Sequence, residues 1–359
     1  MKKIFLLFFL SFICLLSSHA QYLAGFSDYK NYYYIFNEGA LQQLETMPVE
    51  KTFSNQNAVF YENNLSELWA YYDDEKILLS SVYSKLHVKD FLATYELANI
   101  LYVFQNGTNM MLTKYFESYK TGDEMVAFID KDNDLFKVFF NGEVTILEDI
   151  AEGIHIESYQ LNDNLLAYTT DQDYFKMFYN NELTEISSSA EKIIYSVGKN
   201  TLAFWDDMAL EFAVYQNGEK FFLESNKPVS FSAGDNLVAY INNYEEFKVF
   251  FNENEYLISS FQPEFYEVID ELVIYTEQGY FKVFCNGKIY TLESYMPNYE
   301  ANMNKILYLD AAKNLIFFDN GNVLSITNEE VNSFILSGSL PVFETGINKT
   351  KFFFNGKIY

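Results

Sequence analysis

Three aspartates at alternate positions, Asp130, Asp132 and Asp134, resemble the start of a calcium-binding loop. Hard cations such as Ca²⁺ need several carboxylate oxygens, and such a loop supplies them at this spacing. The pattern then departs from the loop, because Leu135 stands where glycine is required and Asn141 stands where the twelfth residue should be glutamate. An ordinary solvated turn is therefore the favoured interpretation, and Ca²⁺ binding is the alternative.

The sequence supplies few residues for other chemistry, and we predict no catalytic residue. It contains no Gly-x-Ser-x-Gly motif, and beyond the N-terminal segment only His87 and His155 could act as imidazole bases. We expect His155 to be a partly buried structural residue. Two histidines without a cysteine cluster make a zinc site improbable. A polysaccharide hydrolase needs two facing carboxylates, but among 50 acidic residues candidate pairs are too numerous to be informative.

The charge of the chain limits its partners. The formal net charge is −26, and all 24 basic residues are lysines. Nucleic acid and anionic lipid surfaces are disfavoured because they bind basic patches, whereas a basic partner is compatible with this charge. Aromatic residues make up 19% of the chain, which excludes a disordered acidic tail.

The N-terminal 20 residues have the features of a secretory signal peptide. Lys2 and Lys3 precede an apolar run over 4–16, and small residues end the segment at Ala20. That run is shorter than the ~20 residues that span a bilayer, so we expect no transmembrane segment in the mature chain, 21–359. The predicted location is periplasmic, cell-surface or secreted. The mature chain keeps only Cys285, which we expect to be a buried apolar residue rather than a reactive thiol.

A short aromatic strand that runs into an asparagine-containing turn recurs along the mature chain. Its penultimate residue is asparagine in nine copies and aspartate in the other, and successive copies are 33 to 39 residues apart. Asparagine, aspartate and glycine adopt the positive φ that a two-residue hairpin turn requires, so each copy predicts a hairpin. The ten copies are at 32–38, 68–74, 101–107, 136–142, 175–181, 212–218, 247–253, 281–287, 315–321 and 350–356.

Two further strands precede the hairpin in each unit. One is a nearly continuous apolar run, as at 165–168, 237–240 and 272–275, which is typical of a strand covered on both faces. The other is shorter and leads into a turn, best seen at 229–236. Four short strands in about 35 residues, repeated ten times, predict an all-β β-propeller of about ten four-stranded blades. Residues 229–260 resemble the repeats of TolB-like, WD-type β-propellers, and this resemblance concerns the fold.

Some features of the architecture are left open by the sequence. A β-solenoid and a tandem β-sandwich are the competing folds. Ten units could form one ring or two five-bladed rings, and one continuous array is preferred because no linker marks a midpoint. The first unit lacks an evident leading strand. The turns expected between the second and third strands carry acidic residues, at 130–134, 171–173, 206–207, 245–246, Glu277 and Asp310.

These observations favour an exported, non-catalytic binding module that presents one face to a protein or glycan partner. The alternative is a carboxylate-based polysaccharide hydrolase at the mouth of the propeller, and a third possibility is a purely structural envelope component. No cofactor is predicted apart from the Ca²⁺ alternative. Aromatic strands are expected to pack between blades, with Tyr295 and Tyr299 as possible exceptions that stack on sugars. Because the repeated motif is scaffold, binding should depend on residues that vary between copies.

Overall fold

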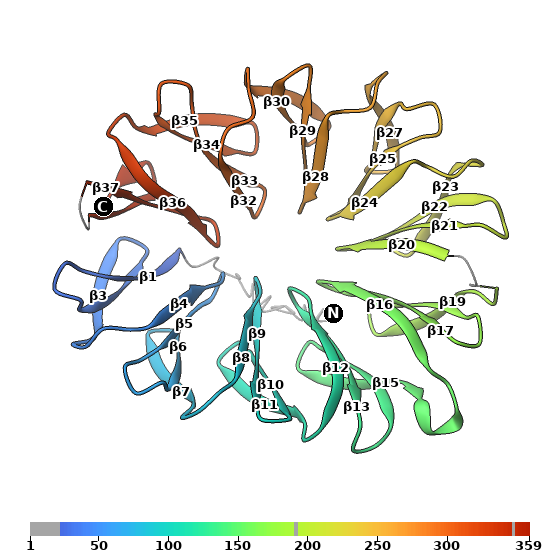
Figure 1. The fold of residues 1–359 in the computed structure, drawn as a ribbon, viewed down its shortest axis with the longest axis horizontal. Helices are drawn as coiled ribbons and strands as arrows, with labels where there is room; N and C mark the ends of the chain where they lie inside the picture. The colour runs from blue at the N-terminus through green and yellow to red at the C-terminus, as the bar shows by residue number, and fades with distance from the viewer. Residues whose placement is uncertain (1–21, 190–192, 347–348) are drawn as a thin grey trace, which may run out of the picture.

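The computed structural model describes residues 22–189, 193–346 and 349–359, and the predicted signal peptide lies outside them. Ten antiparallel sheets stand side by side in one closed ring (Figure 1). The predictions of an all-β propeller and of one continuous array are therefore confirmed, and the two-ring alternative is wrong. In the described part of the chain, no helix is long and apolar enough to cross a membrane.

The strands of the first five sheets follow the chain from the innermost strand outward. The first sheet contains β1 (Leu23–Ser27), β2 (Tyr33–Asn37) and β3 (Ala40–Glu45). The next two contain β4 (Lys51–Ser54), β5 (Ala58–Glu62), β6 (Leu68–Tyr72), β7 (Glu75–Ser80), and β8 (Lys85–Val88), β9 (Leu92–Leu97), β10 (Ile100–Gln105), β11 (Thr108–Thr113). The fourth and fifth contain β12 (Phe116–Thr121), β13 (Met125–Asp130), β14 (Leu135–Phe140), β15 (Glu143–Asp149), and β16 (Ile156–Asn162), β17 (Leu165–Thr170), β18 (Phe175–Tyr179), β19 (Glu182–Ser187). A 3₁₀ turn, η1 (Ile150–Glu152), lies between these last two sheets.

The remaining five sheets repeat the same order. The sixth and seventh contain β20 (Ile193–Gly198), β21 (Thr201–Asp206), β22 (Glu211–Gln216), β23 (Glu219–Glu224), and β24 (Ser230–Gly234), β25 (Leu237–Ile241), β26 (Phe247–Phe251), β27 (Asn254–Ser259). The eighth and ninth contain β28 (Phe265–Ile269), β29 (Leu272–Glu277), β30 (Tyr280–Cys285), β31 (Lys288–Glu293), and β32 (Tyr299–Asn302), β33 (Lys305–Leu309), β34 (Leu315–Asp319), β35 (Asn322–Thr327). The tenth contains β36 (Val331–Ser337), β37 (Leu340–Thr345), β38 (Thr350–Phe354) and β39 (Lys357–Ile358).

The recurring motif forms the hairpin between the last two strands of each sheet, which are the third and fourth strands in the nine four-stranded sheets. In β30 and β31, Cys285 pairs with Lys288 across the turn, and Asn286 and Gly287 have φ values of 50° and 74°. These positive values match a two-residue turn whose twist follows the twist of the strands. The hairpin prediction is confirmed, together with its cause.

Aromatic side chains fill the space between neighbouring sheets. In the cluster between the fourth and fifth sheets, Phe136 of β14 packs on Tyr159 of β16 and Tyr168 of β17, with ring centroids 5.3 and 5.2 Å apart. The same cluster includes Phe178 of the fifth sheet. The second and third strands are buried on both faces because a neighbouring sheet covers each side. The aromatic excess is thus largely packing between blades, as predicted.

Two lysines of the repeated motif, Lys176 and Lys248, link neighbouring blades, whereas Lys137 and Lys282 pair with carboxylates of their own sheets. The ammonium group of Lys176 lies 2.5 Å from the Glu148 carboxylate of the preceding sheet, and the Tyr168 hydroxyl donates to the same carboxylate at 2.6 Å. Lys248 lies 3.1 Å from Glu224, again in the preceding sheet. The repeated lysine is therefore part of the scaffold.

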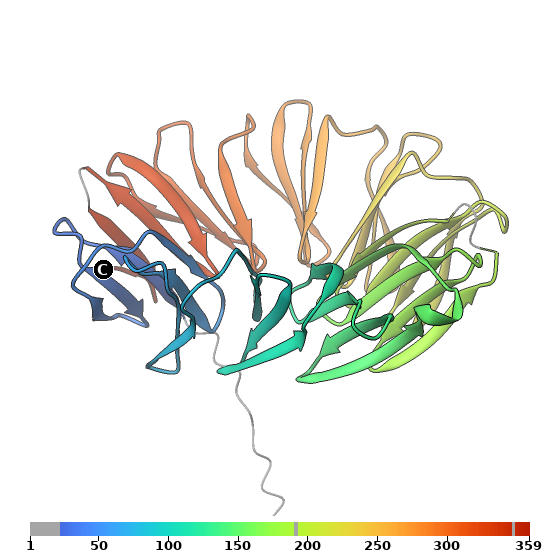
Figure 2. The same ribbon diagram turned by 60° about the horizontal axis from the view of Figure 1, so that its bottom comes forward.

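In the part of the chain that the structure describes, the ring closes by side-chain contacts and not through a shared strand. Among the described residues the first sheet has three strands, as the sequence indicated, and the last sheet is built from β36–β39 alone. The Ser337 hydroxyl donates to the carbonyl of Leu23 at 2.9 Å, and the rings of Phe36 and Phe352 stack with centroids 4.4 Å apart. Figures 1 and 2 show the two sheets side by side.

Cys285 provides a simple test of the core. It is 2% exposed, and burial raises the pKa of its thiol to about 11. Because the thiolate is the reactive form, we expect this thiol in the 21–359 chain to react with a disulfide reagent only slowly while the protein is folded. The same chain in concentrated urea should react rapidly and with one equivalent. Rapid reaction of the native protein would contradict the buried position.

Candidate binding site in the central channel

The innermost strands bound the central channel, and one position on each of them varies strongly in charge. This position pairs with the third residue of the apolar second-strand motif, for example His87 with Thr94 and Lys120 with Ala127. We call the residues at this register position the wall series. They are Phe53, His87, Lys120, Gln160, Ser196, Ser232, Glu267, Glu300 and Ile335.

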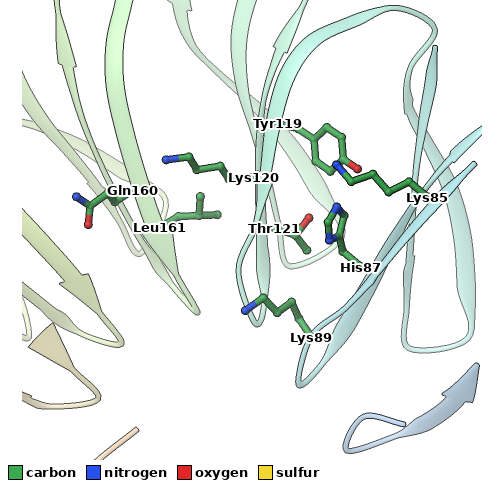
Figure 3. Close-up of a pocket in the computed structure, with 8 residues that line it drawn as sticks. All are labelled: Lys85, His87, Lys89, Tyr119, Lys120, Thr121, Gln160 and Leu161. Atoms are coloured by element: carbon green, nitrogen blue, oxygen red, sulfur yellow. The ribbon is translucent and has the colours of Figure 1, made fainter. Parts of the chain in front are cut away.

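One side of the channel is basic. Three side chains of the third sheet, Lys85, His87 and Lys89, line a cavity of about 470 Å³ together with Lys120 of β12 and Gln160 of β16. Figure 3 shows Lys85 and His87 on β8 with Lys89 just beyond its end, and Lys120 of β12 extending toward Gln160. We call this cavity the basic pocket. Its remaining lining residues are Tyr119, Thr121 and Leu161.

The charged groups of the basic pocket are only partly neutralised. The Lys120 ammonium donates to the Tyr159 carbonyl at 2.6 Å, and the Lys85 ammonium lies 3.7 Å from the Glu96 carboxylate. Lys89 is exposed, and its ammonium group has no hydrogen bond or ion pair with the rest of the described chain. Burial and the adjacent Lys85 lower the pKa of His87, so its imidazole is neutral near neutral pH. Positive charge in this pocket comes from the lysines.

The opposite side of the channel is acidic. Glu267 of β28 and Glu300 of β32 belong to the wall series and lie about halfway around the ring from the basic pocket (Figure 1). The Tyr299 hydroxyl donates to Glu267. Glu300 is exposed and lines a second cavity of about 460 Å³ with Pro297 and Phe334. The wall series therefore gives the channel two walls of opposite charge.

Acidic turns crowd together where the first strand of each sheet turns into the second. We call these the hub turns. Those of the third to ninth sheets surround a cavity of about 250 Å³. Of the described residues that line this cavity, Lys199 is the one basic residue. The acidic residues are Asp90, Asp123, Asp163, Asp235, Asp270 and Glu271.

Burial and mutual repulsion favour the neutral form of several hub carboxyl groups. Burial, followed by the charge of Asp123, raises the pKa of Asp90 to about 7. Burial and then Asp163 raise the pKa of Asp235 to about 8. Burial raises the pKa of Asp163 to about 6, although the Lys199 ammonium lies 2.8 Å from its carboxylate. Carboxyl groups with perturbed pKa values in a cavity are typical of functional sites, but also of structural networks.

The hub turns also hold neighbouring sheets together. The side chains of Asn164, Asn200, Asn236 and Glu271 form a chain of hydrogen bonds of 2.6, 3.0 and 2.8 Å across four sheets. The Asp235 carboxylate accepts the backbone N–H of Lys199 at 3.3 Å. The hub turns therefore stabilise the ring as well as lining an acidic cavity.

The acidic turns that the sequence singled out lie elsewhere, between the second and third strands. Most begin with a side chain that accepts backbone N–H groups of its own turn, as Asp206 does from Met208 and Ala209 at 2.9 and 3.0 Å. Asp310 does the same for Ala312 and Asn314. These bonds support the favoured interpretation of ordinary turns that stabilise their own backbone.

The three aspartates of the calcium hypothesis lie in one of these turns. Asp130 is buried, and its carboxylate accepts from Thr113, Asn133 and Lys137 at 2.8, 2.9 and 2.6 Å. Burial alone would raise the pKa of Asp130, but these bonds lower it overall. Asp132 and Asp134 are exposed. Among the described residues, no group of three or more His, Cys, Asp or Glu side chains is arranged to hold a metal ion. Ca²⁺ binding stays a prediction.

Sequence reasoning misplaced or missed several side chains. His155 is exposed beside η1, so its assignment as a partly buried residue is wrong. Tyr299 packs on Phe281 with ring centroids 5.2 Å apart, whereas Tyr295 is 37% exposed. The basic pocket was missed because its lysines lie on two strands of a very acidic chain. An alignment of the leading strands would have revealed the change of charge along the wall series.

Comparison with known proteins supports the architecture. Residues 17–359 match the family described as a 10-bladed beta propeller domain. Similar solved structures include the computationally designed Ika8 protein, at 14% identity and a TM-score of 0.35, covering 84% of this chain and 98% of that one. The CRINKLY WD40 ectodomain of the Arabidopsis thaliana receptor kinase ACR4 has 7% identity and a TM-score of 0.34, covering 64% and 89%. PorZ of Porphyromonas gingivalis, an essential bacterial surface component of the type-IX secretion system, has 8% identity and a TM-score of 0.30, covering 92% and 56%. Likeness at this level carries no argument about function, and no curated protein matches the sequence.

Proposed function

Because the chain belongs to the family of 10-bladed beta propeller domains, we propose that it is an exported, non-catalytic binding module that holds part of a protein or glycan partner in its central channel. The observation that carries the proposal is the wall series. At one register position the scaffold places His87 and Lys120 on one side of the channel and Glu267 and Glu300 on the other. The fold does not require this variation, since the same position is Ser196 in the sixth sheet.

Binding in the channel is favoured over binding at the outer surface. The outer hairpin turns begin with asparagine in nine sheets and aspartate in one, so they present similar surfaces. The channel brings different residues from all the sheets toward one axis, so a single ligand can contact several of them at once. The channel walls carry charges of both signs, which fix the orientation of a charged ligand, because a wrongly oriented ligand is repelled by groups of its own charge. The acidic wall and hub are compatible with a basic segment of the partner.

A position-specific crosslinking experiment tests this function. A photoreactive residue is placed in the 21–359 chain either at Gln160, in the channel wall, or at Val144, on the exposed fourth strand β15. Irradiation in envelope or secreted material from the source cells should give a discrete adduct at Gln160 and none at Val144. A double E267K/E300K variant should lose the adduct. Equal labelling at both positions, or no adduct at either, would contradict the proposal.

Polysaccharide hydrolysis is a second candidate, favoured by one observation. Asp90 and Asp235 line the hub cavity with pKa values raised to about 7 and 8, which is the range expected of a general acid. This candidate predicts release of reducing sugar from a polysaccharide and its loss in the Asp235→Asn variant. Turnover without a captured partner would replace the binding proposal by the enzymatic one.

A further inference from the structure

We propose that the basic pocket is the binding site for an extended acidic peptide segment whose carboxylates alternate along the chain. This inference rests on the proposed function and assigns the chemistry of the partner at one wall of the channel. Its basis is the arrangement of Lys85, His87 and Lys89 on the third sheet and of Lys120 beside them.

The spacing of the pocket matches an extended peptide. Lys85 and His87 occupy alternate positions of β8, and Lys89 directly follows its last residue, where its backbone N–H still donates to the Leu92 carbonyl at 2.9 Å. Leu86 and Val88 between them pack against the second sheet. Alternate residues of a strand are about 7 Å apart and share one face. An extended peptide has the same repeat, so acidic residues at its alternate positions share one face and lie opposite Lys85, His87 and Lys89 in register. The neutral His87 can donate its ring N–H to the carboxylate opposite it. A compact anion would contact only one or two of these groups.

The open edge of the third sheet supplies the rest of the recognition. Among the described residues β8 pairs only with β9, so its other edge faces the channel with free backbone groups. Peptides commonly bind such edges by adding a strand, with backbone hydrogen bonds for affinity and side chains for specificity. On β12, the exposed Lys120 uses one hydrogen bond to Tyr159 and keeps other N–H groups for a ligand.

Charge localises the segment at this wall. The chain as a whole carries −26 charges, so an acidic peptide is repelled from most of its surface. The hub carboxyl Asp90 follows Lys89 directly, which disfavours extension of the peptide into the hub. The segment should therefore run along the wall from Lys89 toward Lys85, away from the hub.

Binding of defined probes to the 21–359 chain tests the inference. The main probe is a fluorescent peptide in which glutamate and threonine alternate, and its control has the same residues in two blocks. Anisotropy should show tighter binding of the alternating peptide, weakened on the order of tenfold by raising salt from about 0.05 M to about 0.5 M. A K85E/K89E variant should bind it at least about tenfold more weakly. K288E, on the outer strand β31, should change affinity less than about twofold. Thermal unfolding of both variants checks that they are folded.

Other outcomes would overturn the assignment. Equal affinity for the two peptides would exclude an extended register, and tighter binding of an oligogalacturonate would replace the peptide by an acidic glycan. Competition by inorganic phosphate at equal concentration would indicate a small-anion site. The proposed function fails separately: if the Gln160 crosslink persists while neither peptide binds, the channel binds its partner through other groups and only this inference is lost.

Discussion

Replacement of Gly198 by alanine is expected to destabilise the ring more than any other single-methyl change in the hub. A Cβ atom at this position would lie 2.0 Å from the carbonyl oxygen of Gly234 in the next sheet. Gly198 and Gly234 are both buried, and the clash is with the Gly234 backbone, so it can be relieved only if the sixth and seventh sheets move apart. Overpacking of this kind costs about 3 kcal/mol or more. In a chain of this size that corresponds to a fall in Tm of about 4 °C or more.

A glycine at the equivalent position of the fourth sheet provides the matched control. In Gly122→Ala the new Cβ would meet Asn162 and Leu161 at 3.3 Å, which is close but can be relieved by small shifts. We expect its Tm to stay within about 3 °C of the unmodified protein, since a lower entropy of the unfolded chain offsets part of the cost. Thermal unfolding followed by circular dichroism measures both variants. If Gly198→Ala is as stable as Gly122→Ala, the close approach of the two sheets is wrong.

The second large effect is a loss of stability as the pH rises from about 5 to about 8. The pKa values of Asp90, Asp163 and Asp235 are raised from 3.8 to about 7, 6 and 8, so the folded state binds protons more tightly than the unfolded chain. The stabilisation that these protonated carboxyl groups give is fully present below their pKa in the unfolded chain. It is lost as the pH rises through their pKa values in the folded state. We therefore expect Tm to be several degrees higher at about pH 5 than at about pH 8. Carboxylates with lowered pKa values, such as Glu277, act in the opposite direction only at lower pH.

Removal of one hub charge should flatten this dependence. Asp235→Asn removes a carboxyl group but keeps an oxygen that can accept the Lys199 N–H. We expect the variant to be at least as stable as the unmodified protein at about pH 8, with a smaller difference between the two pH values. Asp132→Asn, at an exposed turn outside the hub, should leave the difference unchanged. A Tm that rises with pH over this range would show that the hub carboxyl groups are not crowded as described.

The repeated elements were predictable because their causes are local. Positive φ at Asn286 and Gly287 follows from the residue types, and the hairpin then follows from the turn. The apolar second strands indicated burial on both faces without any knowledge of their neighbours. Ten such units in succession were sufficient to predict the fold.

The candidate site could not be predicted in the same way because it is a property of the closed ring. Asp90 and Asp235 are separated by 145 positions in the sequence and line the same cavity only after the intervening sheets have formed the ring. Each hub aspartate alone has the pattern of a turn residue. The lysines of the basic pocket are likewise hidden by the net charge, which averages over the whole chain. The acidic turns between the second and third strands, which are evident in the sequence, mostly stabilise their own backbone and do not line the hub cavity.

Closure of the ring by side-chain contacts, without a shared strand among the described residues, has a consequence for how such rings can change in size. The contact of Phe36 with Phe352 is an aromatic contact of the kind found between other neighbouring sheets, for example between Phe247 and Tyr275. Among the described residues no strand is shared across this junction, so the first and last sheets are not joined by strand pairing. Duplication or loss of one whole unit would present similar surfaces at the junction. A propeller of this design can therefore gain or lose blades during evolution without a new type of contact between its first and last sheets.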